Sequence, residues 1–190
     1  MTNQKTHFFL ALPLAIDVRE SLARWSQQLA ENVRFKTWVH PADLHITLAF
    51  LGHAEFPAIN ALKKQLTPVI AGHQSFSLAV DQLGTFGSKT SPRILWAGLN
   101  YDQALLDLQR DVRDVCNEIG FQLDQRPYRP HITLARRWLG DERFTNDELM
   151  KSMRPHDGVY EWQVREAVLY QTHMRRTPKY QPLTIFQLGQ

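Results

Sequence analysis

One pentapeptide occurs twice in this chain. The residues His-Ile-Thr-Leu-Ala start at His45 and start again at His131. In a β-strand the side chains alternate between two faces, so the His and Thr of each copy would share one face while Ile and Leu anchor the other. The two threonines are Thr47 and Thr133, each about 6–7 Å along the strand from its histidine. Two such copies predict a duplicated unit whose His-Thr pairs face a shared cleft.

Composition narrows the class of protein. The hydrophobic fraction of 43% and the charged fraction of 22% are typical of a globular domain, and 190 residues are enough to bury a core. The net charge of +3 suits an anionic ligand but is far from polybasic. Cys116 is the only cysteine, which excludes an intrachain disulfide and a cysteine-based zinc site. The absence of a signal-peptide pattern and of a long apolar span predicts a cytoplasmic protein without membrane contact.

Hydrophobic periodicity predicts alternating helices and strands. In the first half we expect strands over 8–12, 44–51 and 76–80 and helices over 17–34 and 57–70. In the second half we expect strands over 93–99, 131–136, 159–170 and 182–188 and helices over 101–119 and 146–153. The glycine- and serine-rich segment 84–92 is expected to be a flexible loop joining the halves. This mixture predicts an α+β fold with antiparallel or mixed sheets.

Two histidines facing one cleft suit a reaction that needs a base and an acid together. Hydrolysis of a phosphodiester is such a reaction: a neutral imidazole takes a proton from water while a protonated one gives a proton to the leaving oxygen. The two threonine hydroxyls can then donate to the two non-bridging phosphoryl oxygens. This chemistry needs no metal or other cofactor, and it predicts a bell-shaped pH–rate profile with both limbs between about pH 5 and 8.

A metal site is the other use of clustered histidines. His40, His45 and His53 lie close together in the sequence, with Asp43 among them. Their spacing matches no recognised ligand pattern, and the second copy of the motif has no matching carboxylate. We therefore predict no metal site.

The repeated motif and its surroundings resemble the 2H phosphoesterases. The closest resemblance is to the RNA 2′,3′-cyclic phosphodiesterases, also called 2′–5′ RNA ligases or LigT-like proteins. Its signature is the pair of His-Ile-Thr-Leu tetrapeptides at 45–48 and 131–134. Further matching segments are 8–11, 48–52, 92–98 and 126–130. The resemblance extends from about Phe8 to Leu188, nearly the whole chain.

The resemblance implies that residues 1–190 form one 2H phosphoesterase domain. That domain would be bilobal and pseudo-twofold, with two mostly antiparallel sheets flanking a central cleft and helices outside. The implied reaction is metal-free hydrolysis of terminal RNA 2′,3′-cyclic phosphodiesters to 2′-phosphomonoesters. The implied partners are RNA or nucleotide ends that carry the cyclic phosphate, with no obligate protein partner.

The resemblance also implies a role for each motif residue. His45 would be the proton donor and His131 the proton acceptor, while Thr47 and Thr133 would bind the phosphate. The repeated sequence itself is symmetric and does not distinguish donor from acceptor.

Arg136 and Phe50 occupy matching positions after the two motifs. In a regular strand Arg136 would point away from Thr133, and only a bend or a strand end would let it reach the phosphate, as the family pattern suggests. Phe50 is expected either to stack on a base or to belong to the core. Both alternatives are open for each residue.

Three other functions are compatible with the sequence. The same residues could run the reverse reaction, 2′–5′ RNA ligation. They could instead hydrolyse a small cyclic phosphodiester without contacting RNA. A non-catalytic module that binds RNA ends is the third possibility, although the only local cluster of cations consists of Arg126, Arg129, Arg136 and Arg137.

Overall fold

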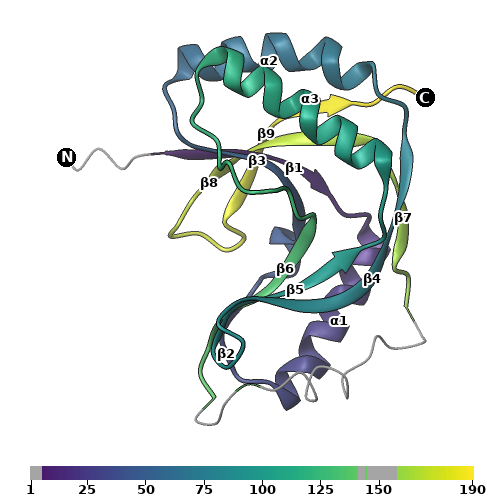
Figure 1. The fold of residues 1–190 in the computed structure, drawn as a ribbon, viewed down its shortest axis with the longest axis vertical. Coiled ribbons are helices and arrows are strands. Elements are labelled where there is room, and N and C mark those ends of the chain that lie inside the picture. The colour runs from purple at the N-terminus through teal and green to yellow at the C-terminus, as the bar shows by residue number, and fades with distance from the viewer. Residues whose placement is uncertain (1–5, 141–143, 145–157) are drawn as a thin grey trace, which may run out of the picture.

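The fold consists of antiparallel strands and three long helices (Figure 1). The computed structural model describes residues 6–140, 144 and 158–190. Its helices are α1 (Ile16–Asn32), the 3-10 helix η1 (Pro41–Asp43), α2 (Phe56–Ala71) and α3 (Gln103–Ile119). Its strands are β1 (His7–Pro13), β2 (Phe35–Trp38), β3 (His45–His53), β4 (Phe76–Gly87), β5 (Pro92–Leu99), β6 (His131–Trp138), β7 (Glu161–Val164), β8 (Glu166–Thr172) and β9 (Tyr180–Gln187).

The strands form one continuous sheet, and the fewest residue pairs join its two middle strands. The order is β7-β4-β5-β6-β3-β1-β8-β9, and β2 pairs with β6. The two motif strands, β3 and β6, are joined by a single antiparallel pair, Ile46 with Ile132, which we call the central isoleucine pair. From this pair the sheet divides into a first lobe of β1, β3, β8 and β9 and a second lobe of β2, β4, β5, β6 and β7 (Figure 1). The predicted α+β class with a mostly antiparallel sheet is confirmed.

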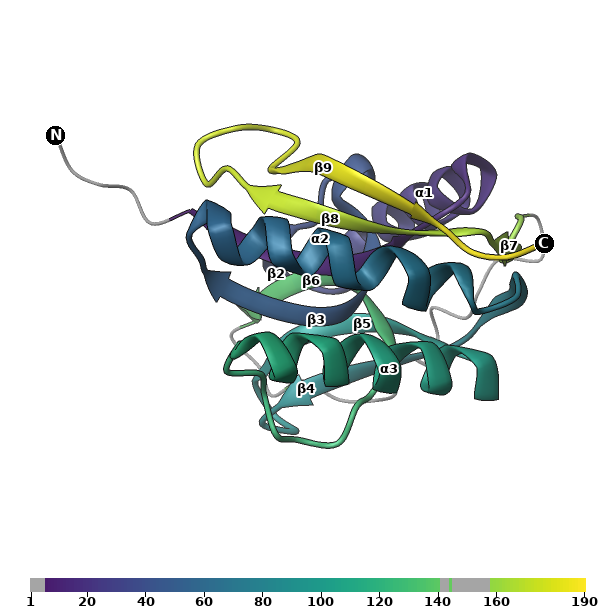
Figure 2. The ribbon, with the colours of Figure 1, turned by 90° about the horizontal axis from the view of Figure 1, so that it is seen from above.

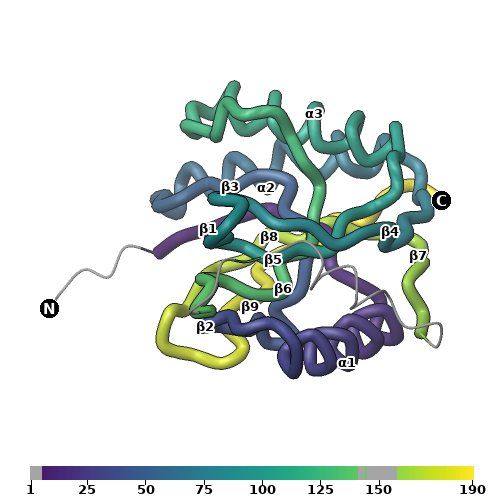
Figure 3. The backbone as a smooth tube through the Cα atoms, turned by 60° about the horizontal axis from the view of Figure 1, so that its bottom comes forward, coloured from purple at the N-terminus to yellow at the C-terminus, as the bar shows by residue number. Residues whose placement is uncertain are grey.

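The helices tie the two lobes together. α2 and α3 run side by side over the first lobe, where α3 packs on β3 and α2 packs on β9 (Figures 1 and 2). α1 lies on the other side of the strands (Figure 3). Ser21 of α1 accepts a hydrogen bond from the Val159 backbone, and Trp25 packs edge-on against Tyr160 near the start of β7. Since α1 follows a first-lobe strand and α3 a second-lobe strand, each half contributes a helix to the other lobe.

The prediction of a flexible loop over 84–92 was wrong. β4 continues to Gly87 and β5 begins at Pro92, so residues 88–91 are the turn of a hairpin. This hairpin lies within the second lobe and does not join the two halves. A Cβ atom at Gly84 would overlap the ring of Trp96, so glycine at 84 serves close packing rather than flexibility.

Strand β2 was not predicted. It is only four residues long and buries only Phe35, so it carries no period-two pattern that a sequence could reveal. The predicted strand over 159–170 is two strands that separate at Arg165, because β7 pairs with β4 while β8 pairs with β1.

The helix predictions agree with the structure to within a few residues. α3 begins where the Asp102 side chain accepts a hydrogen bond from the Leu105 backbone, and it ends at Gly120 in a left-handed conformation. The helix predicted over 146–153 lies outside the described residues. Within the described residues, no helix is both long and apolar enough to span a membrane.

Candidate active site

The four motif side chains lie on one face of the paired motif strands. The central isoleucine pair is fully buried, so the residues before and after it point the other way, and they are half-buried. Because the pairing is antiparallel, extending its register by one residue places His45 opposite Thr133. The same register places Thr47 opposite His131. The two predicted His-Thr pairs therefore meet as one quartet with approximate twofold symmetry, on what we call the inter-lobe face.

Both histidines are held in the same tautomer. The Nδ1 atom of His45 lies 2.7 Å from the carbonyl oxygen of Asp43, and Nδ1 of His131 lies 2.7 Å from that of Arg129. A carbonyl oxygen only accepts, so Nδ1 carries the proton in each ring. Nε2 is then the atom that gains or loses a proton. In His45 this atom lies 3.1 Å from the Thr47 hydroxyl.

A β-bulge turns Arg136 onto the inter-lobe face. Leu134 and Ala135 together occupy the place of one residue in the register with β5, and both are fully buried. The extra residue restores Arg136 to the side on which Thr133 lies. Consistent with that position, the charge of Arg136 lowers the pKa of both motif histidines. The sequence left open whether Arg136 points away from Thr133, as in a regular strand, or is turned to the same side by a bend. The structure has the bend.

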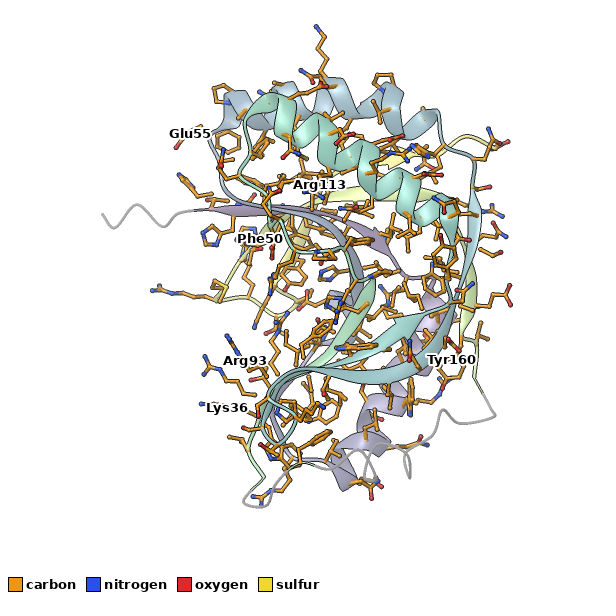
Figure 4. All side chains as sticks on the ribbon, viewed as in Figure 1. Lys36, Phe50, Glu55, Arg93, Arg113 and Tyr160 are labelled. Atoms are coloured by element: carbon orange, nitrogen blue, oxygen red, sulfur yellow. The ribbon has the colours of Figure 1, made fainter. Side chains whose placement is uncertain are left out.

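Strand β3 has the same bulge. Leu48 and Ala49 are both buried in consecutive positions, where the register with β1 shifts. Phe50 is thereby turned outward and is 57% exposed, with its ring 6.2 Å from that of His7. Figure 4 shows Phe50 projecting from the first lobe. The alternative of a core phenylalanine is wrong, and the aromatic face is open to a ligand.

Aromatic side chains that the sequence reasoning did not identify surround each imidazole. The ring of His45 lies 4.9 Å from Phe9 and 5.2 Å, edge to face, from Tyr180. The ring of His131 lies 4.9 Å, also edge to face, from Phe86. These contacts partly shield both imidazoles from water. No spacing in the sequence indicates them, since the aromatic residues come from strands far apart in the chain.

Burial shifts the acid–base chemistry of both histidines. It lowers the pKa of His45 to about 4, even though the bond to the Asp43 carbonyl raises it; the charges of Arg136 and His131 lower it further. Burial and Arg136 also lower the pKa of His131. Both rings are therefore neutral at neutral pH in the free protein. An anion bound between them would raise both pKa values, because a nearby negative charge favours the protonated imidazole.

Asp43 links the first motif to the β8–β9 connection. Its carboxylate is buried and accepts backbone hydrogen bonds of 2.9–3.1 Å from Lys179 and Tyr180. Its carbonyl oxygen holds His45. The residue thus positions both the imidazole and the Tyr180 ring that packs on it. The sequence reasoning considered Asp43 only as a metal ligand, and no group of three or more His, Cys, Asp or Glu residues in the described parts of the chain is arranged to hold a metal.

Side chains from elsewhere complete the hydrogen bonding of β3 where it diverges from β6. The Tyr128 hydroxyl donates to the Thr47 carbonyl at 3.0 Å, and the Gln109 amide donates to the Leu48 carbonyl at 3.3 Å. Strand pairing no longer satisfies these carbonyls beyond the central isoleucine pair. The two bonds therefore hold the first motif in place without a neighbouring strand on that side.

The comparisons with known proteins agree with this geometry. The family model of the 2′-5′ RNA ligase superfamily matches residues 18–176. The RNA 2′,3′-cyclic phosphodiesterase of Geobacillus stearothermophilus is 42% identical over 185 residues, which are 97% of this chain and 58% of that protein. The protein of the same name from Bacillus subtilis (strain 168) is 32% identical over the full length of both chains. This chain thus spans little more than half of the Geobacillus relative and all of the Bacillus one.

Solved structures show the same fold. The crystal structure of E. coli LigT complexed with 3′-AMP superimposes with a TM-score of 0.80 at 26% identity, covering 97% of this chain and 99% of that one. The apo form of E. coli LigT has a TM-score of 0.78 at 27% identity, with coverage of 97% and 98%. With the family model matched over most of the chain and two copies of the His-Thr motif on one face, this chain belongs to the 2′-5′ RNA ligase superfamily.

Proposed function

We propose that this protein hydrolyses 2′,3′-cyclic phosphodiesters at RNA ends and leaves a 2′-phosphomonoester. The observation that carries the proposal is the register of the central isoleucine pair, which brings two imidazoles with unprotonated Nε2 atoms and two hydroxyls to one face. Family membership and the names of the Geobacillus and Bacillus relatives support the same reaction.

In the proposed mechanism the two histidines act on opposite sides of the phosphorus. Nε2 of His131 takes a proton from the attacking water, and a new P–O bond forms. Protonated His45 gives its Nε2 proton to O3′ as the P–O3′ bond breaks, so the products are a 2′-phosphate and a free 3′-hydroxyl. Thr47 and Thr133 donate to the two non-bridging oxygens, where negative charge develops, and Arg136 adds a positive charge on the same face.

The assignment of donor and acceptor rests on the family resemblance, and burial acts against it. With a pKa of about 4, His45 is almost entirely unprotonated at neutral pH in the free protein and has no proton to donate. The donor role therefore requires that the bound phosphate, an anion, raise this pKa before the leaving oxygen departs. We also expect the lower limb of the kcat/KM profile to lie below about pH 5, outside the window expected for an unperturbed imidazole.

The proposal is tested by the product formed from adenosine 2′,3′-cyclic phosphate in excess EDTA. We expect 2′-AMP as the only product, identified by chromatography against both isomers. Formation of 3′-AMP would mean that the other P–O bond breaks. Loss of turnover in EDTA with recovery on adding a divalent cation would reject the metal-free mechanism. Binding of a cyclic-phosphate RNA without turnover would favour the non-catalytic module.

Arg136→Gln is expected to move both limbs of the kcat/KM pH profile to higher pH. The guanidinium lowers the pKa of both histidines, so its removal raises both values. The rate should also fall by about 10–100-fold, since a charge-assisted hydrogen bond is worth about 1.5–3 kcal/mol. The measurement is a pH–rate profile from about pH 4 to 9. Arg113→Gln on α3 removes a guanidinium that is not among the charges shifting the pKa of either histidine, so it should leave both limbs in place. Unchanged limbs in Arg136→Gln would contradict the prediction.

A further inference from the structure

Three strands meet beside Arg136. Strand β6 lies between β2 and β5, and the two registers place Thr37 of β2 and Ile94 of β5 on either side of Arg136. This row borders the inter-lobe face. The next row outward along β6 is one residue farther from the motif. Its Arg137 has a left-handed backbone, so the regular alternation of faces does not continue through this residue.

That next row consists entirely of cations. Lys36 of β2 lies between the pairs Phe35–Trp138 and Thr37–Arg136 and so aligns with Arg137 of β6. Extending the register of β5 by one residue beyond the pair Ile94–Arg136 adds Arg93 to the row. All three residues are exposed. We call them the cation row. Neighbouring positions in such a row have Cα atoms about 5 Å apart, so the row spans about 10 Å.

The cation row is electrostatically unfavourable in the protein alone. Like charges in directly opposed positions of a sheet destabilise it. In the described part of the chain, none of the three side chains forms an ion pair. Arg137 also has a φ of 63°, a conformation that non-glycine residues rarely adopt. An anion bound across the row would relieve the repulsion.

The cation row lies farther along β6 from the motif than Arg136 does. Arg136 is among the charges that shift the pKa of His45 and of His131, whereas none of the three row residues is. Arg136 is therefore positioned to contact the reacting phosphate, and the cation row is positioned to contact a second phosphate of the same ligand. Lys36 and Arg93 project from the second lobe on the side where Phe50 projects from the first (Figure 4). A strand that enters from this side would pass the row before its end reaches the motif histidines.

We propose that the cation row of Lys36, Arg137 and Arg93 binds a backbone phosphate upstream of the terminal nucleotide, so that the preferred substrate is an RNA chain and not a free cyclic nucleotide. This inference rests on the proposed function of the inter-lobe face. Phosphate contacts of this kind position a nucleic acid without reading its sequence. The row therefore confers a preference for chain length and none for base identity.

The test compares three substrates with the same terminal nucleoside and cyclic phosphate that differ in what lies upstream of it. They are adenosine 2′,3′-cyclic phosphate, its 5′-phosphorylated form, and a penta-adenylate that ends in the same cyclic phosphate. We expect the kcat/KM of the wild type to be about tenfold or more higher for the pentamer than for the mononucleotide. An equal gain from the 5′-phosphate alone would identify a small nucleotide as the preferred ligand and overturn the RNA assignment.

The charge-removing variant is Lys36→Gln/Arg93→Gln. It should lower kcat/KM for the pentamer by about tenfold or more, mainly through KM, and should change turnover of the cyclic mononucleotide by less than about twofold. Its plot of log kcat/KM against log salt should become shallower by about 0.7, the value for one phosphate contact on a single strand. Lys36→Arg/Arg93→Lys keeps the charges and should restore the preference.

Lys64→Gln is the matched control, because it removes one exposed cation from α2 on the other lobe. It should leave all three substrates unaffected. Equal losses on pentamer and mononucleotide in the cation-row variant, or no length preference in the wild type, would overturn the inference. If the wild type hydrolyses none of the substrates, the proposed function fails instead. The affinity of the pentamer for wild type and variant, measured by fluorescence anisotropy, would then test the row alone, and equal affinities would reject it.

Discussion

His131→Ala is expected to lower kcat for a 2′,3′-cyclic nucleotide by about 10²–10⁴-fold, and His45→Ala by a similar factor. Each substitution removes an Nε2 atom that exchanges a proton with the substrate or with water in the proposed mechanism. The measurement is steady-state kinetics on adenosine 2′,3′-cyclic phosphate, with circular dichroism to verify folding. His53→Ala, at the far end of the same strand β3, is the matched control and should retain activity.

The double variant His45→Ala/His131→Ala separates concerted from independent action. If both groups act in one transition state, the double variant should lose about as much kcat as either single variant does. Effects of residues that act as a unit are strongly non-additive. Activity within about tenfold of the wild type in either single variant would contradict the two-histidine mechanism.

A substrate with sulfur in place of O3′ distinguishes the proton donor from the acceptor. A thiolate leaves without protonation, so the variant that lacks the donor should recover most of its activity on this substrate, and the variant that lacks the acceptor should not. Recovery in His45→Ala would support the assignment proposed here. Recovery in His131→Ala would reverse the assignment, in agreement with the lowered pKa of His45.

Asp43→Ala is expected to destabilise the fold by about 2–4 kcal/mol. Its buried carboxylate satisfies the backbone N–H groups of Lys179 and Tyr180, and each donor left without a partner costs about 1–3 kcal/mol. The measurement is urea unfolding, with the midpoint compared at constant slope. Asp81→Ala, which removes an exposed carboxylate from β4, should change stability by less than about 0.5 kcal/mol.

The same substitution should lower kcat while the protein is still folded. Tyr180 packs edge-on against His45 at 5.2 Å, and Asp43 helps to hold the Tyr180 backbone beside that ring. Asp43→Asn keeps one acceptor oxygen, so it should recover part of the lost stability and part of the lost kcat. Full activity in Asp43→Ala under conditions where it is folded would show that the residue stabilises the protein without positioning the imidazole.

Much of the site was predictable because a strand repeats every two residues. A His and a Thr two positions apart share a face wherever the segment is extended, so Thr47 and Thr133 followed from the motif alone. The α+β class and the three long helices likewise followed from local periodicity.

Features that depend on a partner strand were not predictable in the same way. The position of Arg136 depends on a bulge in the register between β5 and β6, and the role of Gly84 depends on the ring of Trp96 on the neighbouring strand. Strand β2 was missed because its pairing with β6, not its own pattern, makes it a strand.

The sequence by itself determined which side chains we propose for the chemistry and on which kind of element they stand, since both follow from residue identity and a local period. Only the tertiary structure decided how those side chains meet: one isoleucine pair sets the register of the quartet, and Asp43 reaches a backbone 136 residues away. It also decided the pKa of His45, because burial by residues from distant strands excludes the water that would stabilise its charged form.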